Sequence, residues 1–424
     1  MNLITTSYGV RILTLGIGAI SNFVVATLLL DSFGNEGYAV WVILTSLPSL
    51  IPFADLGLGS NIFNYFADKS QRREAQNNVT EVFLLSIFFS IFFILVIALL
   101  IFVLSNISYL TSRVSTKNLY VGLCIMAITF VAVPFSLATK KMFAEEKIAS
   151  VFFIQGLIPP LTASATFILL SNNIQSVYFL VFVPSVTYLI TTLAIFKVSA
   201  ITKFFAFTNF EKFRRNIRKS LSLGGWSLCI TTVTTLVWQA PKYVIQTFGT
   251  PIDLTSYSLM SLFLIPGLSL TAVAATWNTT RVRRRDHSAD VTLMTKRSIR
   301  VSQIASVIFS IFAFLGFQVM NKVGFVTPDY SSQFIAFVAL MSCSTWMIPL
   351  STFTSKFDLR WIAIRIIPCF IFSILILAIL INFHYNLALL FYILLFNILT
   401  SFFSMKRVRN LQDLQAAPQQ ISLE

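Results

Sequence analysis

Residues 38–66 read YAVWVILTSLPSLIPFADLGLGSNIFNYF, a long apolar run that contains one charged residue, Asp55. A helix needs about 20 such residues to cross roughly 30 Å of hydrocarbon, whereas a barrel strand needs about 10 with strict alternation. The run therefore predicts a membrane-spanning helix. A carboxylate near the bilayer centre costs at least about 2.5–3.5 kcal/mol on insertion scales, so it usually faces protein or water. Asp55 is therefore a candidate functional residue.

The composition extends this prediction to the whole chain. Hydrophobic residues make up 56% of the 424 residues, charged residues make up 11%, and there are 43 phenylalanines, a balance that water-soluble domains do not tolerate. We predict an all-α integral membrane protein of about twelve transmembrane helices. The expected spans are 9–30, 38–66, 81–105, 118–139, 148–170, 175–196, 221–245, 255–277, 299–320, 333–355, 359–381 and 386–404.

The distribution of positive charge predicts the orientation of these helices. Most of the 31 Lys and Arg residues fall in alternate connections, and placing both termini in the cytoplasm puts those connections inside. Arg113, Lys117 and Lys322 fall outside, and Lys242 lies within a span. This positive-inside bias already accounts for the net charge of +15, so we expect no nucleic-acid partner.

The chain divides at a basic loop into two halves with six predicted spans each. Two lobes of the same orientation would be parallel repeats that enclose a central cavity, an architecture that suits alternating access. The predicted parts are an N-terminal lobe over 1–197, an inter-lobe loop over 198–220, a C-terminal lobe over 221–404 and a cytoplasmic tail over 405–424.

A weak internal repeat supports this division. In the first half, Phe33-Gly34 is followed by Tyr38 at the start of the second span. In the second half, Phe248-Gly249 is followed by Tyr257 at the start of the eighth span, with four extra residues between the glycine and the tyrosine. The repeat predicts that the two halves begin with the same pair of helices.

Three neighbouring features form a recognisable pattern: the run Phe33-Gly34-Asn35-Glu36-Gly37-Tyr38, a Leu- and Pro-rich helix, and the string Asp55-Leu56-Gly57-Leu58-Gly59. This pattern resembles the polysaccharide-exporter branch of the multidrug/oligosaccharidyl-lipid/polysaccharide flippase superfamily. Within that branch it resembles bacterial O-antigen flippases. The similarity is most specific over about residues 8–66. The chain departs from the pattern at Asp31-Ser32, where many relatives carry Arg, and at Pro241-Lys242, where relatives often have an acidic-basic pair.

The resemblance implies a function. Members of this family move undecaprenyl-pyrophosphate-linked oligosaccharides from the inner to the outer leaflet of the bacterial cytoplasmic membrane. The resemblance also implies that the protein has no cofactor and that a proton or sodium gradient is the energy source. The expected partners are the lipid-linked oligosaccharide, the lipid bilayer, and a polysaccharide polymerase with its chain-length machinery.

Intramembrane cations are the candidate contacts for an anionic lipid substrate. Arg11 lies on a polar or small stripe of the first span with Thr14, Gly18, Ser21 and Asn22. A guanidinium matches phosphate oxygens in a bidentate fork, and a lysine ammonium provides a compact charge. Snorkelling to the headgroups, and close helix packing through Gly18 and Ser21, are the structural alternatives.

Further candidates follow from position. Lys242 follows Pro241, which is expected to bend the seventh span. Arg281 and Arg365 are cavity-mouth candidates whose simpler explanation is the positive-inside rule. The candidate hinges are Gly57, Gly59 and Pro241.

Asp55 and Arg11 form a hypothetical pair. At about 1.5 Å rise per residue they differ in depth by roughly 10 Å, a gap that the long Arg side chain and the flexible glycines partly bridge. The alternative is that Asp55 caps a structural helix break.

Enzyme functions fit the sequence poorly. The chain has no Gly-rich phosphate loop ending in Gly-Lys-Ser/Thr, and His287 and His384 lack partners at metal-ligand spacing. We therefore expect no catalytic residues and no metal. An O-antigen polymerase or ligase would need a sizeable outward loop, and the predicted outward loops are short. A multidrug exporter of the same superfamily, with a hydrophobic cation as substrate, is the main alternative.

Overall fold

The computed structural model describes residues 2–50, 58–67, 72–105, 116–174, 176–204, 230, 232–284, 291–324, 326–356, 359–381 and 384–416. These residues form helices and short connections, with no strand among them. Nine of the helices in these ranges are long and apolar enough to cross a membrane, judged by length and composition. The predicted all-α membrane architecture is confirmed.

The remaining predicted spans also correspond to helices. The first long helix, α1 (Asn2–Ser46), contains both the first predicted span and the start of the second. The seventh and eleventh spans correspond to a helical segment over 232–248 and to α15 (Leu359–Leu380). About twelve spans are therefore consistent with the structure.

Contacts divide the chain into two compact units. One contains Met1–Leu262 and Met320–Thr327, and the other contains Phe263–Val319 and Pro328–Glu424. The division falls within α12 (Pro251–Arg284). Residues 205–229, which include most of the predicted inter-lobe loop, lie outside the described residues, so the two predicted lobes and their central cavity stay predictions.

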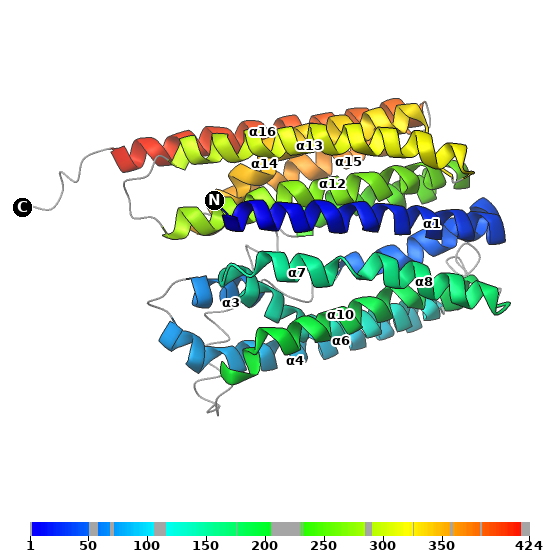
Figure 1. Ribbon diagram of the computed structural model, residues 1–424, viewed down its shortest axis with the longest axis horizontal. Coiled ribbons are helices and arrows are strands. Elements are labelled where there is room, and N and C mark those ends of the chain that lie inside the picture. The colour runs from blue at the N-terminus through cyan, green and yellow to red at the C-terminus, as the bar shows by residue number, and fades with distance from the viewer. Residues whose placement is uncertain are drawn as a thin grey trace, which may run out of the picture. The chain divides into compact units, whose positions relative to one another are not determined.

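The first unit begins with a hairpin of two helices. Gly34 has φ 64° and ψ −172°, and the chain turns back after it, as Figure 1 shows for α1. Only glycine adopts this backbone region readily, because it has no Cβ. After Ser46 the helix tightens into a 3-10 turn, Leu47–Leu50, which contains Pro48. Proline removes a backbone donor, which accounts for the change from α-helix to 3-10 turn here. The next described part of the predicted second span is α3 (Leu58–Ala67).

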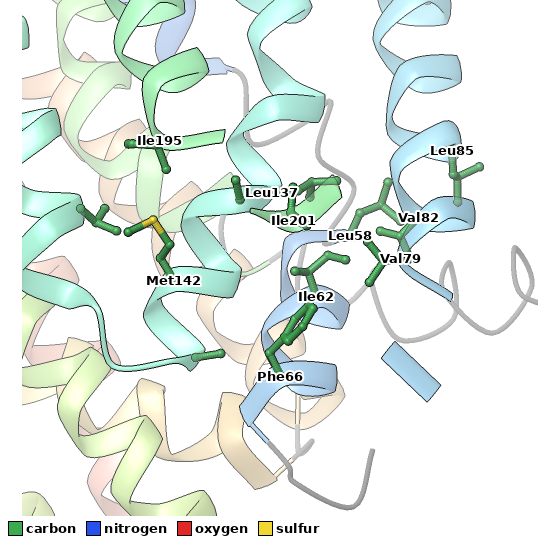
Figure 2. Close-up of a cluster of buried hydrophobic side chains, with 13 residues drawn as sticks. Leu58, Ile62, Phe66, Val79, Val82, Leu85, Leu137, Met142, Ile195 and Ile201 are labelled. Carbon is green, nitrogen blue, oxygen red and sulfur yellow. The ribbon is translucent and has the colours of Figure 1, made fainter. Parts of the chain in front are cut away.

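The other helices of the first unit pack around a common core. α6 (Thr116–Ala144) lies between α4 (Arg72–Ser105) and α10 (Phe182–Ser199). Figure 2 shows part of their core, an apolar cluster of α3, α4, α6 and α10. The cluster includes Leu58, Ile62, Val82, Leu137 and Ile195.

Two predicted spans of this unit are each built from two helices. The fifth consists of α7 (Ile148–Gln155) and α8 (Ile158–Ser171), with Pro159 and Pro160 in the first turn of α8, where proline is tolerated. The sixth consists of α9 (Val177–Leu180) followed by α10.

The second unit contains the later part of α12, α13 (Val291–Lys322), α14 (Tyr330–Lys356), α15 and α16 (Tyr385–Ala416). A buried polar contact joins α14 to α16. The Trp346 indole donates to Asn397 Oδ1 at 2.6 Å, and Asn397 Nδ2 donates to Ser342 Oγ at 2.6 Å. Each buried polar atom in this contact has a partner, as an apolar environment requires.

Candidate functional site

Three helical segments meet in the first unit through buried hydroxyl groups. The Tyr38 hydroxyl lies 3.1 Å from Ser258 Oγ, which joins α1 to α12. The Ser46 hydroxyl lies 3.0 Å from the Tyr243 hydroxyl, which joins α1 to segment 232–248. The Tyr257 hydroxyl donates to the Trp238 carbonyl oxygen at 2.8 Å, which joins α12 to the same segment. We call these contacts the hydroxyl junction.

The local sequence explains why the junction forms. Tyr38 and Tyr257 are 0% and 1% exposed, so their hydroxyls need partners within the protein. Tyr38 also stacks on Trp41 with ring centroids 5.8 Å apart, which fixes the ring direction. Tyr38 and Tyr257 are the two tyrosines of the internal repeat. Tyr38 bonds Ser258, the residue after Tyr257 in the chain, whereas Tyr257 itself bonds Trp238.

Lys242 lies beside this junction in the sequence, between Pro241 and Tyr243. Its side chain is 7% exposed, and within the described residues it makes no hydrogen bond or ion pair. A buried charge without a partner is costly, so such cations usually pair with another group or serve a function. The role of Lys242 in contact with an anionic group, and the alternative of snorkelling to the membrane surface, both stay predictions. Lys242 is the strongest described candidate for contact with an anionic group.

Arg11 is in a different environment. Its guanidinium lies 4.5 Å from the centroid of the Phe152 ring, which is a cation–π contact with α7. Nearby, a Cβ added at Gly18 would lie 3.3 Å from Pro159 Cγ, so α1 and α8 pack closely there. Close helix packing therefore accounts for Gly18. Arg11 and Lys242 belong to different elements, α1 and segment 232–248.

The remaining candidate residues are placed only in part. Gly59 is buried in α3, Pro241 is buried within segment 232–248, and Arg365 is partly exposed on α15. Arg281 belongs to α12, but its side chain lies outside the described residues. Asp55 and Gly57 also lie outside them, so the proposed pairing of Asp55 with Arg11 stays a prediction.

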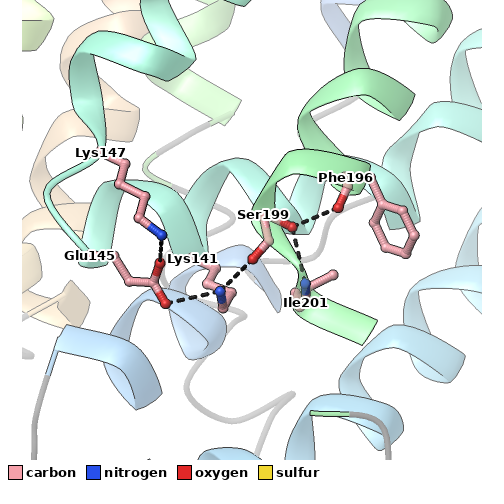
Figure 3. Close-up of polar contacts among 6 residues, drawn as sticks. All are labelled: Lys141, Glu145, Lys147, Phe196, Ser199 and Ile201. Atoms are coloured by element: carbon pink, nitrogen blue, oxygen red, sulfur yellow. Dashed lines mark hydrogen bonds and ion pairs between the residues drawn. The ribbon is translucent and has the colours of Figure 1, made fainter. Parts of the chain in front are cut away.

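A buried lysine network was missed by the sequence reasoning. Lys141 was not singled out from the sequence, yet it is 3% exposed near the end of α6. Its Nζ donates to the Ser199 carbonyl oxygen at 2.6 Å and pairs with Glu145 Oε1 at 2.9 Å, as Figure 3 shows. The i,i+4 spacing of Lys141 and Glu145 was visible in the sequence. The contact with α10 was not, because it depends on tertiary packing.

The same network includes Glu145 and Lys147, which lie in the turn between α6 and α7. Lys147 Nζ lies 2.8 Å from Glu145 Oε2. Partial burial alone would raise the pKa of Glu145, but the hydrogen bonds and charges of Lys147 and Lys141 outweigh it, so this pKa lies below its usual value. The network connects the end of α10 to the α6–α7 turn, and we assign it a role in stabilising this packing.

The second unit contains a cavity of about 410 Å³ between α12, α13 and α14. Phe263, Phe314, Phe317 and Tyr330 are among its lining residues, and no charged residue lines it. This cavity therefore suits apolar groups and not a phosphate. Across the described residues, no group of three or more His, Cys, Asp or Glu side chains could hold a metal ion.

Comparisons with known proteins agree with the predicted resemblance. No protein-family model matches the chain. A Yersinia pseudotuberculosis protein, named as a candidate O-antigen export protein, is 26% identical over 251 residues, which cover 55% of this chain and 54% of that protein. The matched region thus spans about half the length of this curated relative.

Solved structures show the same fold over nearly the whole chain. A MOP superfamily transporter from Pyrococcus furiosus, described as having a binding pocket of reverse polarity, matches with a TM-score of 0.69 and 12% identity over 98% of this chain and 96% of its own. An outward-facing multidrug resistance MATE family transporter matches with a TM-score of 0.67 and 14% identity over 97% and 96% of the two chains. The chain therefore has the fold of MATE and other MOP superfamily transporters.

Proposed function

We propose that this protein is a flippase that moves undecaprenyl-pyrophosphate-linked oligosaccharide repeat units, of the O-antigen type, from the inner to the outer leaflet of a bacterial cytoplasmic membrane. The transporter fold and the likeness to a protein named for O-antigen export support this proposal. Transport would proceed by alternating access, driven by a proton or sodium gradient, and would supply a polysaccharide polymerase and its chain-length machinery.

The observation that carries the proposal is the buried Lys242. A pyrophosphate brings negative charge into the protein interior, and a buried ammonium offsets it at short range. A hydrophobic cation would be repelled at the same place. Lys242 therefore favours the anionic lipid-linked substrate over the multidrug alternative.

The MATE neighbours keep a multidrug exporter as the second candidate. Its substrate would be a lipophilic cation, and its pathway would depend on aromatic and acidic or neutral polar groups. The two candidates predict different activities of the wild-type protein in cells. A flippase restores surface polysaccharide, and a multidrug exporter removes a fluorescent lipophilic cation.

A substitution at Lys242 tests the proposal in a host that lacks its own flippase. We expect Lys242→Met to abolish the surface polysaccharide ladder at normal protein level, and Lys242→Arg to retain part of it. Lys322→Met is the matched control, because Lys322 is exposed at the end of α13. A full ladder with Lys242→Met would contradict the role of Lys242. Failure of the wild type to restore any ladder, with efflux of the cation, would favour the exporter.

A further inference from the structure

Within the hydroxyl junction, the contact between Tyr38 and Ser258 lies near one end of the helices. Tyr38 follows the Gly34 turn by four residues, which is about 6 Å along a helix, and Ser258 follows the start of α12 at Pro251 by seven residues, about 10 Å. The positive-inside bias predicts that this end faces outward. The contact between Tyr38 and Ser258 thus lies within about two turns of the predicted outer face.

A separate contact lies near the same end. The backbone N–H of Val326 donates to Thr27 Oγ1 at 3.2 Å, so the turn between α13 and α14 rests on the first half of α1. Thr27 precedes Gly34 by seven residues and therefore lies at a similar depth. This contact agrees with the assignment of Met320–Thr327 to the first unit.

The chemistry of these contacts suits a closure that can open again. All of them are hydrogen bonds between neutral hydroxyl or backbone groups, and Tyr38, Ser46 and Ser258 are 0%, 4% and 3% exposed. Water can replace neutral hydrogen bonds at little cost when a pathway fills with solvent. A buried ion pair would be much harder to separate in an apolar environment.

The position of Tyr38 and Ser258 in the sequence adds a further reason. They belong to the second and eighth spans, the helices that start the two copies of the internal repeat after Gly34 and Gly249. Although both residues belong to the first compact unit, they lie in different predicted halves, and their contact would separate if those halves moved relative to each other. A contact inside one half, such as Thr162 Oγ1 to Thr187 Oγ1 at 3.0 Å, need not change.

We propose that the hydrogen bond between Tyr38 and Ser258 is the closing contact of the outer end of the transport pathway and that it separates in each transport cycle. The proposal rests on the proposed function as a transporter, but it does not depend on which substrate is carried.

Cross-linking tests the proposal. Cysteines replace Tyr38 and Ser258 in a chain whose four native cysteines are substituted, and a short, reducible thiol cross-linker is added. We expect the cross-linked protein to lose transport and to recover it after reduction. The matched pair Thr162→Cys and Thr187→Cys, which also replaces two buried hydroxyls about one hydrogen bond apart, should keep transport when cross-linked. Full transport by the 38–258 cross-linked protein would overturn the proposal.

A second measurement does not require the double variant to fold. Val42 is 2% exposed and lies one helical turn after Tyr38 on α1, so Val42→Cys reports on access from this end. Tyr38→Phe should increase its labelling rate by a membrane-impermeant maleimide added outside intact cells. An unchanged rate would contradict the proposal. Transport by the cysteine-free parent is measured first. Export of polysaccharide by this parent tests the proposed function. The cross-link tests the closing contact separately, with whichever substrate the parent transports.

Discussion

The hydroxyl of Tyr38 lies 3.1 Å from the hydroxyl of Ser258, which joins residues 220 positions apart in the chain through a buried hydrogen bond. Neither residue is charged, and neither stands out in an apolar sequence. Their contact connects the helix after Gly34 with the helix after Gly249. It is the clearest described link between the two copies of the internal repeat.

A double-mutant cycle measures the strength of this link. Tyr38→Phe and Ser258→Ala each leave one buried hydroxyl without its partner, which costs about 1–3 kcal/mol. The double variant removes both groups, so its loss of stability should be smaller than the sum of the single losses by about 0.5–1.5 kcal/mol. Thermal unfolding of the purified wild type, the two single variants and the double variant provides the four stabilities. Simple additivity would show that the hydrogen bond contributes nothing.

Gly156 should not tolerate a side chain. An added Cβ would lie 2.5 Å from Thr14 Cβ, so α1 would have to move away from the α7–α8 turn. The backbone of Gly156 is right-handed helical, so the cost of Gly156→Ala is steric, and overpacking of this kind costs about 1–3 kcal/mol.

The control for this variant lies on α1 itself. Gly16 has nothing within 4 Å of an added Cβ, so Gly16→Ala should stabilise the helix by about 0.5–1 kcal/mol. The midpoints of thermal unfolding should therefore shift in opposite directions. Equal midpoints for the two variants would show that the close contact between Gly156 and Thr14 is absent.

Lys141 should matter for stability, although lysines at the inner end of a span are usually exposed. Lys141→Met keeps the apolar stem but removes the donor to the Ser199 carbonyl oxygen, a charged hydrogen bond worth about 1.5–3 kcal/mol. Lys140→Met, at the adjacent exposed position, should change little. Yield and thermal unfolding of both variants provide the comparison. An equal loss in the two variants would indicate a general charge effect instead of the Ser199 contact.

The pH dependence of stability should show the contribution of Glu145. Its pKa is below the usual value in the folded protein, so its ionised form stabilises the fold above the unfolded pKa of about 4.3, and this contribution disappears as the pH falls through the lower folded pKa. The stability difference between wild type and Glu145→Gln should therefore be constant near neutral pH and should vanish in acid. The effect should be small, because Glu145 is partly exposed and solvent screens its charge. A difference that persists in acid would assign the stabilisation to another group.

Much of the fold followed from the apolar runs. Each predicted span has a matching helix, because about 20 apolar residues in a bilayer must satisfy their backbone hydrogen bonds internally. The interruptions were less predictable. Pro48 lies in a 3-10 turn after the α-helix ends, and Pro159 lies in the first turn of α8. Pro134 and Pro349 instead lie inside continuous helices, because neighbouring packing decides whether a proline breaks a helix.

The candidate site was predictable only where a residue type was unusual for its environment. Lys242 was identified because a lysine within an apolar span is rare, and the structure adds that it is buried. Arg11 was identified for the same reason, and the structure adds its contact with Phe152. Tyr38, Ser46 and Ser258 were not identified as a contact, because isolated hydroxyls in membrane helices are common.

The sequence by itself determined the membrane-spanning class, the approximate number of helices and the resemblance to a flippase family, since these depend on local hydrophobicity and on short motifs. Only the tertiary structure decided that Lys141 is buried, that Gly156 lies against Thr14 and that Tyr38 bonds Ser258. Those facts depend on which helix faces meet. Hydrogen bonds such as that between Tyr38 and Ser258 join residues far apart in the chain, and no local pattern encodes their partner.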